Sequence, residues 1–94
     1  MMKTLSWNSR GFGHPSKIVA LRDLIHQEKP GIILLQETKQ GQREMNGIIE
    51  QQKQFKGSFS EASGASGGIA TMWNHNIWNN KSETINQHWI KTVL

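Results

Sequence analysis

Two polar side chains stand at the ends of two short predicted strands, where they can do chemistry. Asn8 follows residues 3–7, and Glu37 follows the apolar run of residues 32–35 and one glutamine. In open α/β sheets, ligands bind at the carboxyl ends of the strands. A carboxylate there suits Mg²⁺, which is held by one or two carboxylates together with substrate phosphate oxygens. An amide beside it can orient a phosphate or a catalytic side chain, so Asn8 and Glu37 form the candidate site.

Each of these residues also has an ordinary structural interpretation. Asn8 can be a turn residue that hydrogen-bonds its own backbone, and Glu37 can be a solvated acid at a strand end. Arg10, two positions after Asn8, is the best single candidate for a phosphate contact. At this stage both the structural and the chemical interpretation remain open.

The elements that would position these residues are a strand, a helix and a second strand. Residues 3–7 alternate apolar and polar side chains and precede a turn-rich loop. Apolar spacings of three, four and seven then predict an amphipathic helix that starts at Pro15 or Ser16 and ends at residues 29–31, where proline interrupts the helical ladder. A right-handed crossover makes strands 3–7 and 32–35 parallel, so their carboxyl ends share one edge.

The rest of the chain predicts one more helix and four more strands. The apolar positions of residues 42–52 indicate the helix, although this segment is rich in glutamine and contains a glycine. The strands are expected at residues 54–61, 69–73, 83–86 and 88–94, with the small-residue turn 62–68 joining the first two into a hairpin.

Composition excludes several classes of protein. The 94 residues include no cysteine, which rules out a disulfide framework, a thiolate metal site and a cysteine nucleophile. No apolar run approaches the ~20 residues of a membrane-spanning helix, and no signal peptide is visible. We therefore expect a soluble intracellular protein, nuclear or cytoplasmic, without a membrane or disulfide-linked partner. The formal charge of +4 weakly favours DNA or another nucleic acid as partner, because the basic residues are scattered.

Three weaker motifs are assigned no role. The four histidines are far apart in the sequence, so a zinc site is not expected. The glycines of residues 62–68 are more typical of a hairpin turn than of a phosphate loop, because no Lys-Ser/Thr signature follows. Tryptophans can stack on unpaired bases, but the spacing around Trp73 favours a core position.

Three blocks of the sequence carry a family resemblance: WNSRG at 7–11, ILLQET at 33–38 and GGIATMW at 67–73. Together they resemble the endonuclease/exonuclease/phosphatase superfamily, most of all the apurinic-type endonuclease domain of plant non-LTR (LINE) retrotransposons. That domain opens with a WN-x-RG block and has a strand that ends in QET. The resemblance spans nearly the whole chain. It implies an α/β fold, the N-terminal portion of a four-layered DNase I-like sandwich that starts with a β-α-β unit followed by strands.

The resemblance also implies a chemistry, Mg²⁺- or Mn²⁺-dependent hydrolysis of nucleic-acid phosphodiester bonds. In the family, the residue matching Asn8 helps to organise the active-site histidine and the phosphate, and the residue matching Glu37 is a metal ligand. Ser9 stands where the plant type commonly has cysteine, and Gly31 where aspartate is usual; neither position is expected to touch the site. The family's later tyrosine, Asp-x-Asn and Asp-His groups have no counterpart, since the chain has no tyrosine and its single aspartate is Asp23, in the predicted first helix.

These observations predict that residues 1–94 are a partial domain of the family, without its C-terminal part and inactive in isolation. Two alternatives remain. The chain can be a non-catalytic basic module that binds nucleic acid or protein. It can also be a piece that folds only with a complementary partner, because its sheet edge and apolar end are uncovered.

Overall fold

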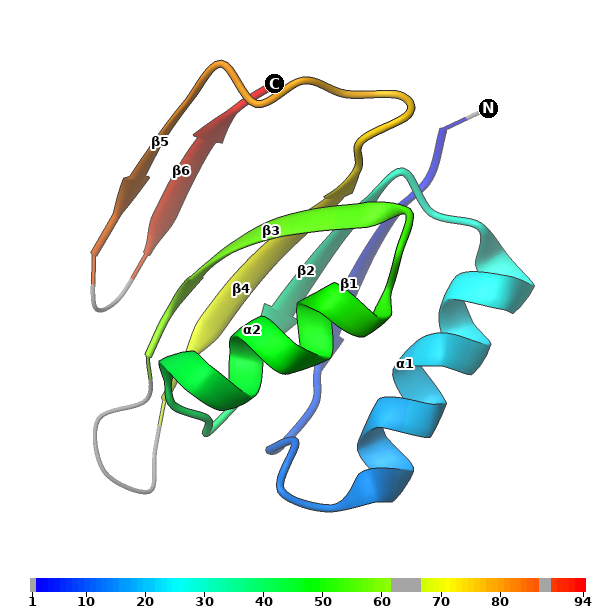
Figure 1. Ribbon diagram of the computed structural model, residues 1–94, viewed down its shortest axis with the longest axis vertical. Coiled ribbons are helices and arrows are strands. Elements are labelled where there is room, and N and C mark those ends of the chain that lie inside the picture. Colours follow the sequence, from blue (N-terminus) through cyan, green and yellow to red (C-terminus); the bar gives the residue numbers. More distant parts are fainter. Residues whose placement is uncertain (1, 62–66, 87–88) are drawn as a thin grey trace.

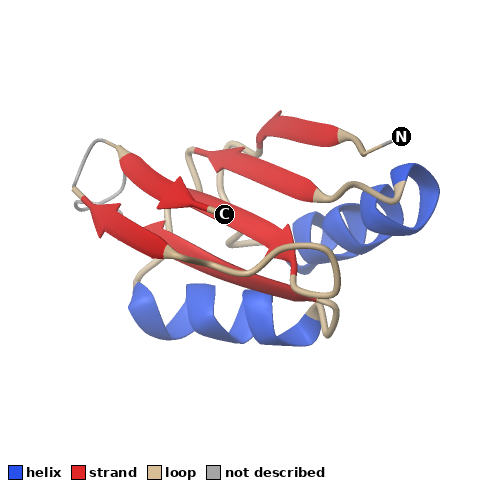
Figure 2. Cartoon of the chain, turned by 90° about the horizontal axis from the view of Figure 1, so that it is seen from above, coloured by secondary structure: helices blue, strands red, loops and turns tan. Residues whose placement is uncertain are grey.

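A mixed sheet with two helices on one face is the centre of the computed structural model, which describes residues 2–61, 67–86 and 89–94 (Figures 1 and 2). In chain order the elements are β1 (Thr4–Asn8), α1 (Pro15–Glu28), β2 (Ile32–Gln36), α2 (Gln42–Gln51), β3 (Phe55–Ser60), β4 (Ile69–Asn74), β5 (Ser82–Ile85) and β6 (Ile90–Val93). Within the described residues, the sheet has the strand order β1-β2-β4-β3, and β5 and β6 pair with each other.

The β1-α1-β2 unit is the predicted crossover. β1 and β2 are parallel, in a register that runs from Thr4 beside Ile32 to Asn8 beside Gln36. The prediction that both strands end at one edge of the sheet is therefore confirmed. β4 pairs with the other side of β2 in the antiparallel direction, so β2 is the inner strand between a parallel and an antiparallel neighbour.

Helix α1 begins at Pro15, as the sequence indicates, but its cap was not predicted. The His14 ring nitrogen Nδ1 accepts a hydrogen bond from the backbone N–H of Ser16 at 3.0 Å, which satisfies one of the free donors of the first turn. The helix ends at Glu28, and the capping residue Lys29, directly before Pro30, lies in the left-handed region with φ 49°. Neither helix of the described chain is long and apolar enough to cross a bilayer.

One apolar core lies between the helices and the sheet. The buried stripe of α2, predicted over 42–52, consists of Met45, Ile48 and Ile49. From α1, Leu21 is completely buried in the same core. The other buried members come from the helix-facing side of the strands and from the loop after β1: Phe12, Ile33, Leu35, Phe55, Ala70 and Met72.

The second face of the sheet is covered only in part. Ile32 and Leu34 of β2 are half-buried on this face, whereas the sequence favoured a strand covered on both sides. The β5–β6 pair packs against β3 and β4, and the Ser58 hydroxyl donates a hydrogen bond to the Glu83 carboxylate. Because Gly57, the neighbour of Ser58, faces α2, this contact places β5 on the side opposite the helices. The layers are therefore helices, sheet and hairpin.

The predicted hairpin and the two further predicted strands are present within the described residues, and the pairing of those two strands is an addition from the structure. β3 and β4 are antiparallel, from Phe55 beside Asn74 to Ser60 beside Ile69. β5 and β6 are antiparallel as well. Most of the turn predicted at 62–68 lies outside the described residues, and so do residues 87–88.

We expect an added methyl group to have opposite effects at two glycines. A Cβ at Gly57 would lie 3.0 Å from Ile49 Cδ1 and 3.1 Å from the Thr71 carbonyl oxygen. Such overpacking costs about 1–3 kcal/mol. Nothing lies within 4 Å of the same atom at Gly47, where alanine favours the helix by about 0.5–1 kcal/mol. In urea denaturation, Gly57→Ala should lower the free energy of unfolding and Gly47→Ala should raise it; a fully stable Gly57→Ala variant would contradict this packing.

Candidate active-site corner

Asn8 and Glu37 meet at the carboxyl edge of the two parallel strands. Asn8 is the last residue of β1 and lies beside Gln36, the last residue of β2, so Glu37 is the first residue beyond the sheet. The Asn8 side-chain nitrogen Nδ2 donates a hydrogen bond to Glu37 Oε2. The strand ends thus bring together the two residues that the sequence singled out, and the bond fixes the amide against the carboxylate.

Asn8 is also the turn residue of the ordinary interpretation. Its Oδ1 accepts a hydrogen bond from the backbone N–H of Arg10 at 3.2 Å, which is an Asx turn. The amide therefore uses its oxygen to shape the loop and its nitrogen to hold the carboxylate. Arg10 is exposed in this loop, two residues from the Asn8–Glu37 pair.

Backbone conformation at this corner is unusual. Arg10, Glu37 and Lys39 have φ values of 57°, 51° and 55°, in the left-handed region that residues other than glycine seldom adopt. Each such residue costs of order 1 kcal/mol and persists only where the surroundings impose it. Residues in this conformation concentrate at binding and catalytic sites. The three left-handed residues therefore indicate a functional site here, independently of the Asn8–Glu37 hydrogen bond.

Ser9 holds the loops of this corner together through hydrogen bonds of its side-chain hydroxyl. Its side chain is fully buried, with Oγ 3.2 Å from the carbonyl oxygens of both Gln36 and Glu37. The same oxygen accepts a hydrogen bond from the Gly11 N–H at 3.3 Å. The expectation that this position does not touch the site is wrong, because the hydroxyl binds the backbone of the residue that carries the candidate metal ligand. Sequence reasoning missed it, since a serine in a polar loop has no signal that distinguishes burial from exposure.

Lys17 ties helix α1 to the same loop. Its Nζ donates a hydrogen bond to the Ser9 carbonyl oxygen at 2.6 Å and lies 5.9 Å from the centre of the Trp7 ring. Trp7 in turn meets Phe12 edge-on, with ring centres 5.6 Å apart. The sequence assigned no role to Lys17, because a lysine in the first turn of a helix looks like any solvated residue.

Backbone hydrogen bonds connect the three sequence blocks at this corner. The Phe12 N–H donates to the Thr38 carbonyl oxygen at 3.0 Å, which joins the first loop to the second. Thr38 and Lys39 donate their N–H groups to the carbonyl oxygens of Gly68 and Gly67 at 3.0 and 2.9 Å. Both glycines have positive φ, as a turn requires. They hold the second loop by backbone bonds directly before β4, whereas most of the hairpin turn that the sequence favoured over a phosphate loop lies outside the described residues.

Other residues singled out in the sequence lie away from this corner. Trp73 is buried in the sheet, with 3% of its surface exposed, which fits the core position expected for it. Trp78 Nε1 donates to Met2 Sδ, and Trp89 is half exposed. His14 caps α1, and His75 Nε2 lies 3.2 Å from the Lys53 carbonyl oxygen. His88 lies outside the described residues.

The corner offers one carboxylate to a metal ion. In the part of the chain that the structure describes, no three His, Cys, Asp or Glu side chains form a group that could hold an ion. Glu37 with a neighbouring amide fits an ion that keeps several waters and takes phosphate oxygens as further ligands, which is how Mg²⁺ commonly binds. It does not fit an ion that needs a closed protein cage.

Comparison with known proteins adds a family match. The family model described as "Endonuclease/Exonuclease/phosphatase family" matches residues 5–93. No curated protein sequence matches the chain.

Two solved structures have a similar fold. The 3′ phosphatase NExo from Neisseria, bound to a product DNA hairpin, superposes with a TM-score of 0.73 at 17% identity, over 92% of this chain and 31% of that one. An AP endonuclease from Archaeoglobus fulgidus gives 0.70 at 20% identity, over 89% and 30%. These similarities confirm the predicted α/β class. This chain spans about a third of the length of either structure.

Proposed function

The chain belongs to the endonuclease/exonuclease/phosphatase family, and from this premise we propose that its Asn8–Glu37 corner is the metal- and phosphate-binding part of a phosphodiesterase site for nucleic acid. The observation that carries the proposal is the hydrogen bond from Asn8 to Glu37 at the shared carboxyl edge of β1 and β2. Ligands of open α/β sheets bind at that edge. The left-handed bends at Arg10 and Glu37 support the same corner.

The proposed roles follow from the contacts. Glu37 would hold a Mg²⁺ or Mn²⁺ ion, which when bound polarises a phosphate oxygen. Asn8 holds the Glu37 carboxylate in one orientation, because its own oxygen is fixed by the Asx turn. Arg10 would contact a phosphate of the nucleic acid, where a guanidinium can donate two parallel hydrogen bonds.

We further propose that residues 1–94 are a partial domain and do not hydrolyse phosphodiesters by themselves. Hydrolysis needs a positioned water and a group that activates it, besides the metal ligand. The chain has no tyrosine. Its single aspartate, Asp23, is an exposed residue of α1, 3.7 Å from Arg22, and not part of the corner. The origin in a plant retrotransposon endonuclease is part of this proposal and is supported by the WNSRG and ILLQET blocks.

One experiment tests both statements. The full chain is incubated with a labelled duplex that contains an abasic site, with and without Mn²⁺, and both binding and cleavage are measured. We expect intact DNA throughout, and tighter binding when Mn²⁺ is present, because an ion that Glu37 would hold adds positive charge that attracts the phosphates. Glu37→Gln should abolish the Mn²⁺-dependent gain. Glu50→Gln, an exposed acid on α2, is the matched control and should keep it.

The two possible failures are distinguishable. Cleavage that is lost in Glu37→Gln would overturn the proposed inactivity but support the site. Mn²⁺-dependent binding that Glu37→Gln retains would overturn the site itself.

A non-catalytic binding module is the second candidate function. The formal charge of +4 and the missing water-activating residues favour it. Binding of DNA that is independent of Mn²⁺ and falls steeply with salt would indicate this function, because phosphate contacts release counterions. A chain that stays unfolded without a complementary piece would instead show no cooperative thermal transition.

A further inference from the structure

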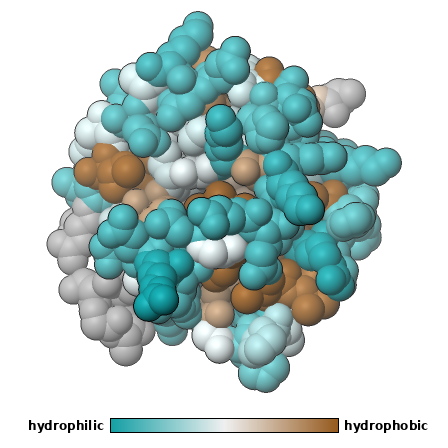
Figure 3. Space-filling model, viewed as in Figure 1, coloured by the Kyte–Doolittle hydropathy of each residue, from teal (hydrophilic) through white to brown (hydrophobic). Residues whose placement is uncertain are grey.

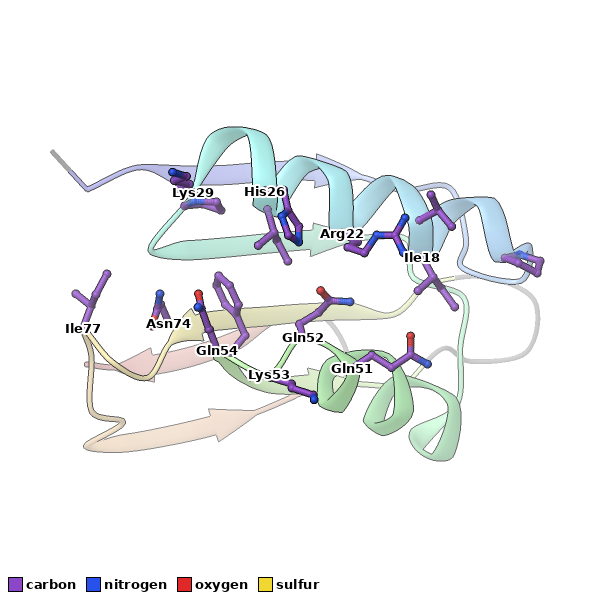
Figure 4. Close-up of a pocket in the computed structure, with 15 residues that line it drawn as sticks. Ile18, Arg22, His26, Lys29, Gln51, Gln52, Lys53, Gln54, Asn74 and Ile77 are labelled. Atoms are coloured by element: carbon purple, nitrogen blue, oxygen red, sulfur yellow. The ribbon is translucent and has the colours of Figure 1, made fainter.

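A groove of about 1170 Å³ runs along helix α1, between this helix and the C-terminal end of α2. Figure 4 shows its two walls. Ile18, Arg22, His26 and Lys29 come from α1, and residues 51–54 from the end of α2 and the segment before β3. The groove follows α1 from Pro15 to Lys29, and Pro30 and Asn74 line it at the end of the strands opposite the Asn8–Glu37 corner.

The ionisable side chains that line this groove are all basic. Its lining includes Arg22, His26, Lys29 and Lys53 and contains no aspartate or glutamate. Within the described residues, neither Lys29 nor Lys53 makes an ion pair. Arg22 approaches Asp23 at 3.7 Å, but both side chains are more than half exposed, so this pair contributes little. An occupant of the groove would meet uncompensated positive charge along its rim.

The groove is also apolar. Ile18 and Ile25, seven positions apart, lie on one side of α1 and line it together with Phe55. Val19 and Ile77 add side chains that are 43% and 58% exposed. In the space-filling view, hydrophobic surface interrupts the hydrophilic surface on the face that carries both helices (Figure 3). A nucleic-acid backbone would lose hydration over such apolar side chains, so this lining favours an occupant with an apolar stripe of its own.

We propose that this groove docks an amphipathic helix of a partner protein, with its apolar stripe on Ile18, Ile25 and Phe55 and with acidic side chains toward the basic rim. This is the helix-in-groove mode of recognition, in which anchors at i, i+3, i+4 and i+7 enter an apolar groove. α1 has 14 residues, a length of about 21 Å at 1.5 Å per residue. A partner helix of three to four turns matches that length. The proposal goes beyond the phosphodiesterase site and does not depend on it.

The test uses the full chain and a designed peptide. A fluorescein-labelled helix of α1's length carries leucine at i, i+3, i+4 and i+7 and mostly glutamate elsewhere, and binding is followed by fluorescence anisotropy. A scrambled peptide of the same composition should bind at least about tenfold more weakly, because its leucines share no face. Lys29→Glu combined with Lys53→Glu should weaken the designed peptide roughly tenfold by like-charge repulsion.

Matched variants distinguish binding in the groove from a general attraction of the peptide to the positive charge of the protein. Lys56→Glu combined with Lys81→Glu makes the same change of charge at exposed lysines outside the groove and should change the affinity less than about twofold. Val19→Ser, which keeps every charge, should weaken binding severalfold. Since all five residues are exposed, urea unfolding should be close to wild type in each variant.

Three results would overturn the proposal: equal affinity for the scrambled peptide, equal loss in the Lys56/Lys81 variant, or no loss in the Lys29/Lys53 variant. A duplex DNA or a phosphatidylserine vesicle is titrated in parallel. If the Lys29/Lys53 variant loses binding to either of these but keeps the peptide, the groove is a nucleic-acid or lipid surface and the proposed helix is wrong.

Discussion

Leu21→Ala should lower the free energy of unfolding by about 3.5 kcal/mol, the middle of the range of about 2–5 kcal/mol for truncating a fully buried leucine. Leu21 is 0% exposed and is the one fully buried residue of α1. The rest of the helix packs through half-buried residues such as Ile18 and Ile25. Because no other residue of α1 is fully buried, we expect the cavity to stay open and the helix to lose its most buried contact with the core.

A domain of this size is stabilised by about 5–10 kcal/mol, so the loss is a large fraction of the total. Val19→Ala, in the same helix but at a position that is 43% exposed, is the control and should change the free energy of unfolding by less than about 0.5 kcal/mol. Equilibrium urea denaturation of the three proteins gives both numbers. Equal stability of the two variants would show that α1 is not held by Leu21.

Much of the fold follows from periodicity and short-range rules. The β1-α1-β2 unit was predictable because the apolar spacing from Ser16 fits one helix, and because a crossover of that length forces the strands to be parallel. The hairpin of β3 and β4 follows from two predicted strand segments around a small-residue turn. The position of β4 between β2 and β3 was not predictable, since it depends on which strand edges bury the most surface.

The site was predictable in part. That Asn8 and Glu37 share an edge follows from the crossover, but the bond between them depends on left-handed bends at Arg10 and Glu37. No local sequence pattern predicts a left-handed conformation in residues other than glycine, because tertiary contacts impose it. The supporting roles of Ser9 and Lys17 are of the same kind, since each partner atom belongs to the backbone of a loop.

Ser9→Ala should lower the free energy of unfolding by about 2 kcal/mol and loosen the candidate site at the same time. The hydroxyl has one hydrogen to donate, toward the carbonyl oxygen of Gln36 or Glu37, and it accepts the Gly11 N–H. Gln36 keeps the hydrogen bond from the Ser9 backbone N–H at 3.1 Å. The main cost is therefore the Gly11 N–H, left without its acceptor, together with the lost bond to Glu37.

Two further variants make the expectation specific. Ser9→Cys, with a weaker donor and acceptor, should fall between wild type and Ser9→Ala. Ser6→Ala, three residues earlier in β1, is the control. The Ser6 hydroxyl accepts a hydrogen bond from Gln36 Nε2 at 3.0 Å, but the residue is exposed and water can replace it, so its loss should cost less than about 0.5 kcal/mol.

The NMR signals of the Asn8 side-chain amide distinguish a role of Ser9 in positioning the site from a role in stability alone. In ¹H–¹⁵N spectra of the folded variants, the Asn8 Nδ2 resonances should move in Ser9→Ala toward their positions in Glu37→Gln, because in both variants the Asn8–Glu37 bond is weakened. Ser6→Ala should leave them where they are in the wild type. If Ser9→Ala is destabilised while the Asn8 amide is unchanged, Ser9 holds the fold but not the site. If Ser9→Ala is as stable as the wild type, the buried hydrogen bonds of the Ser9 hydroxyl do not stabilise the fold and this prediction is wrong.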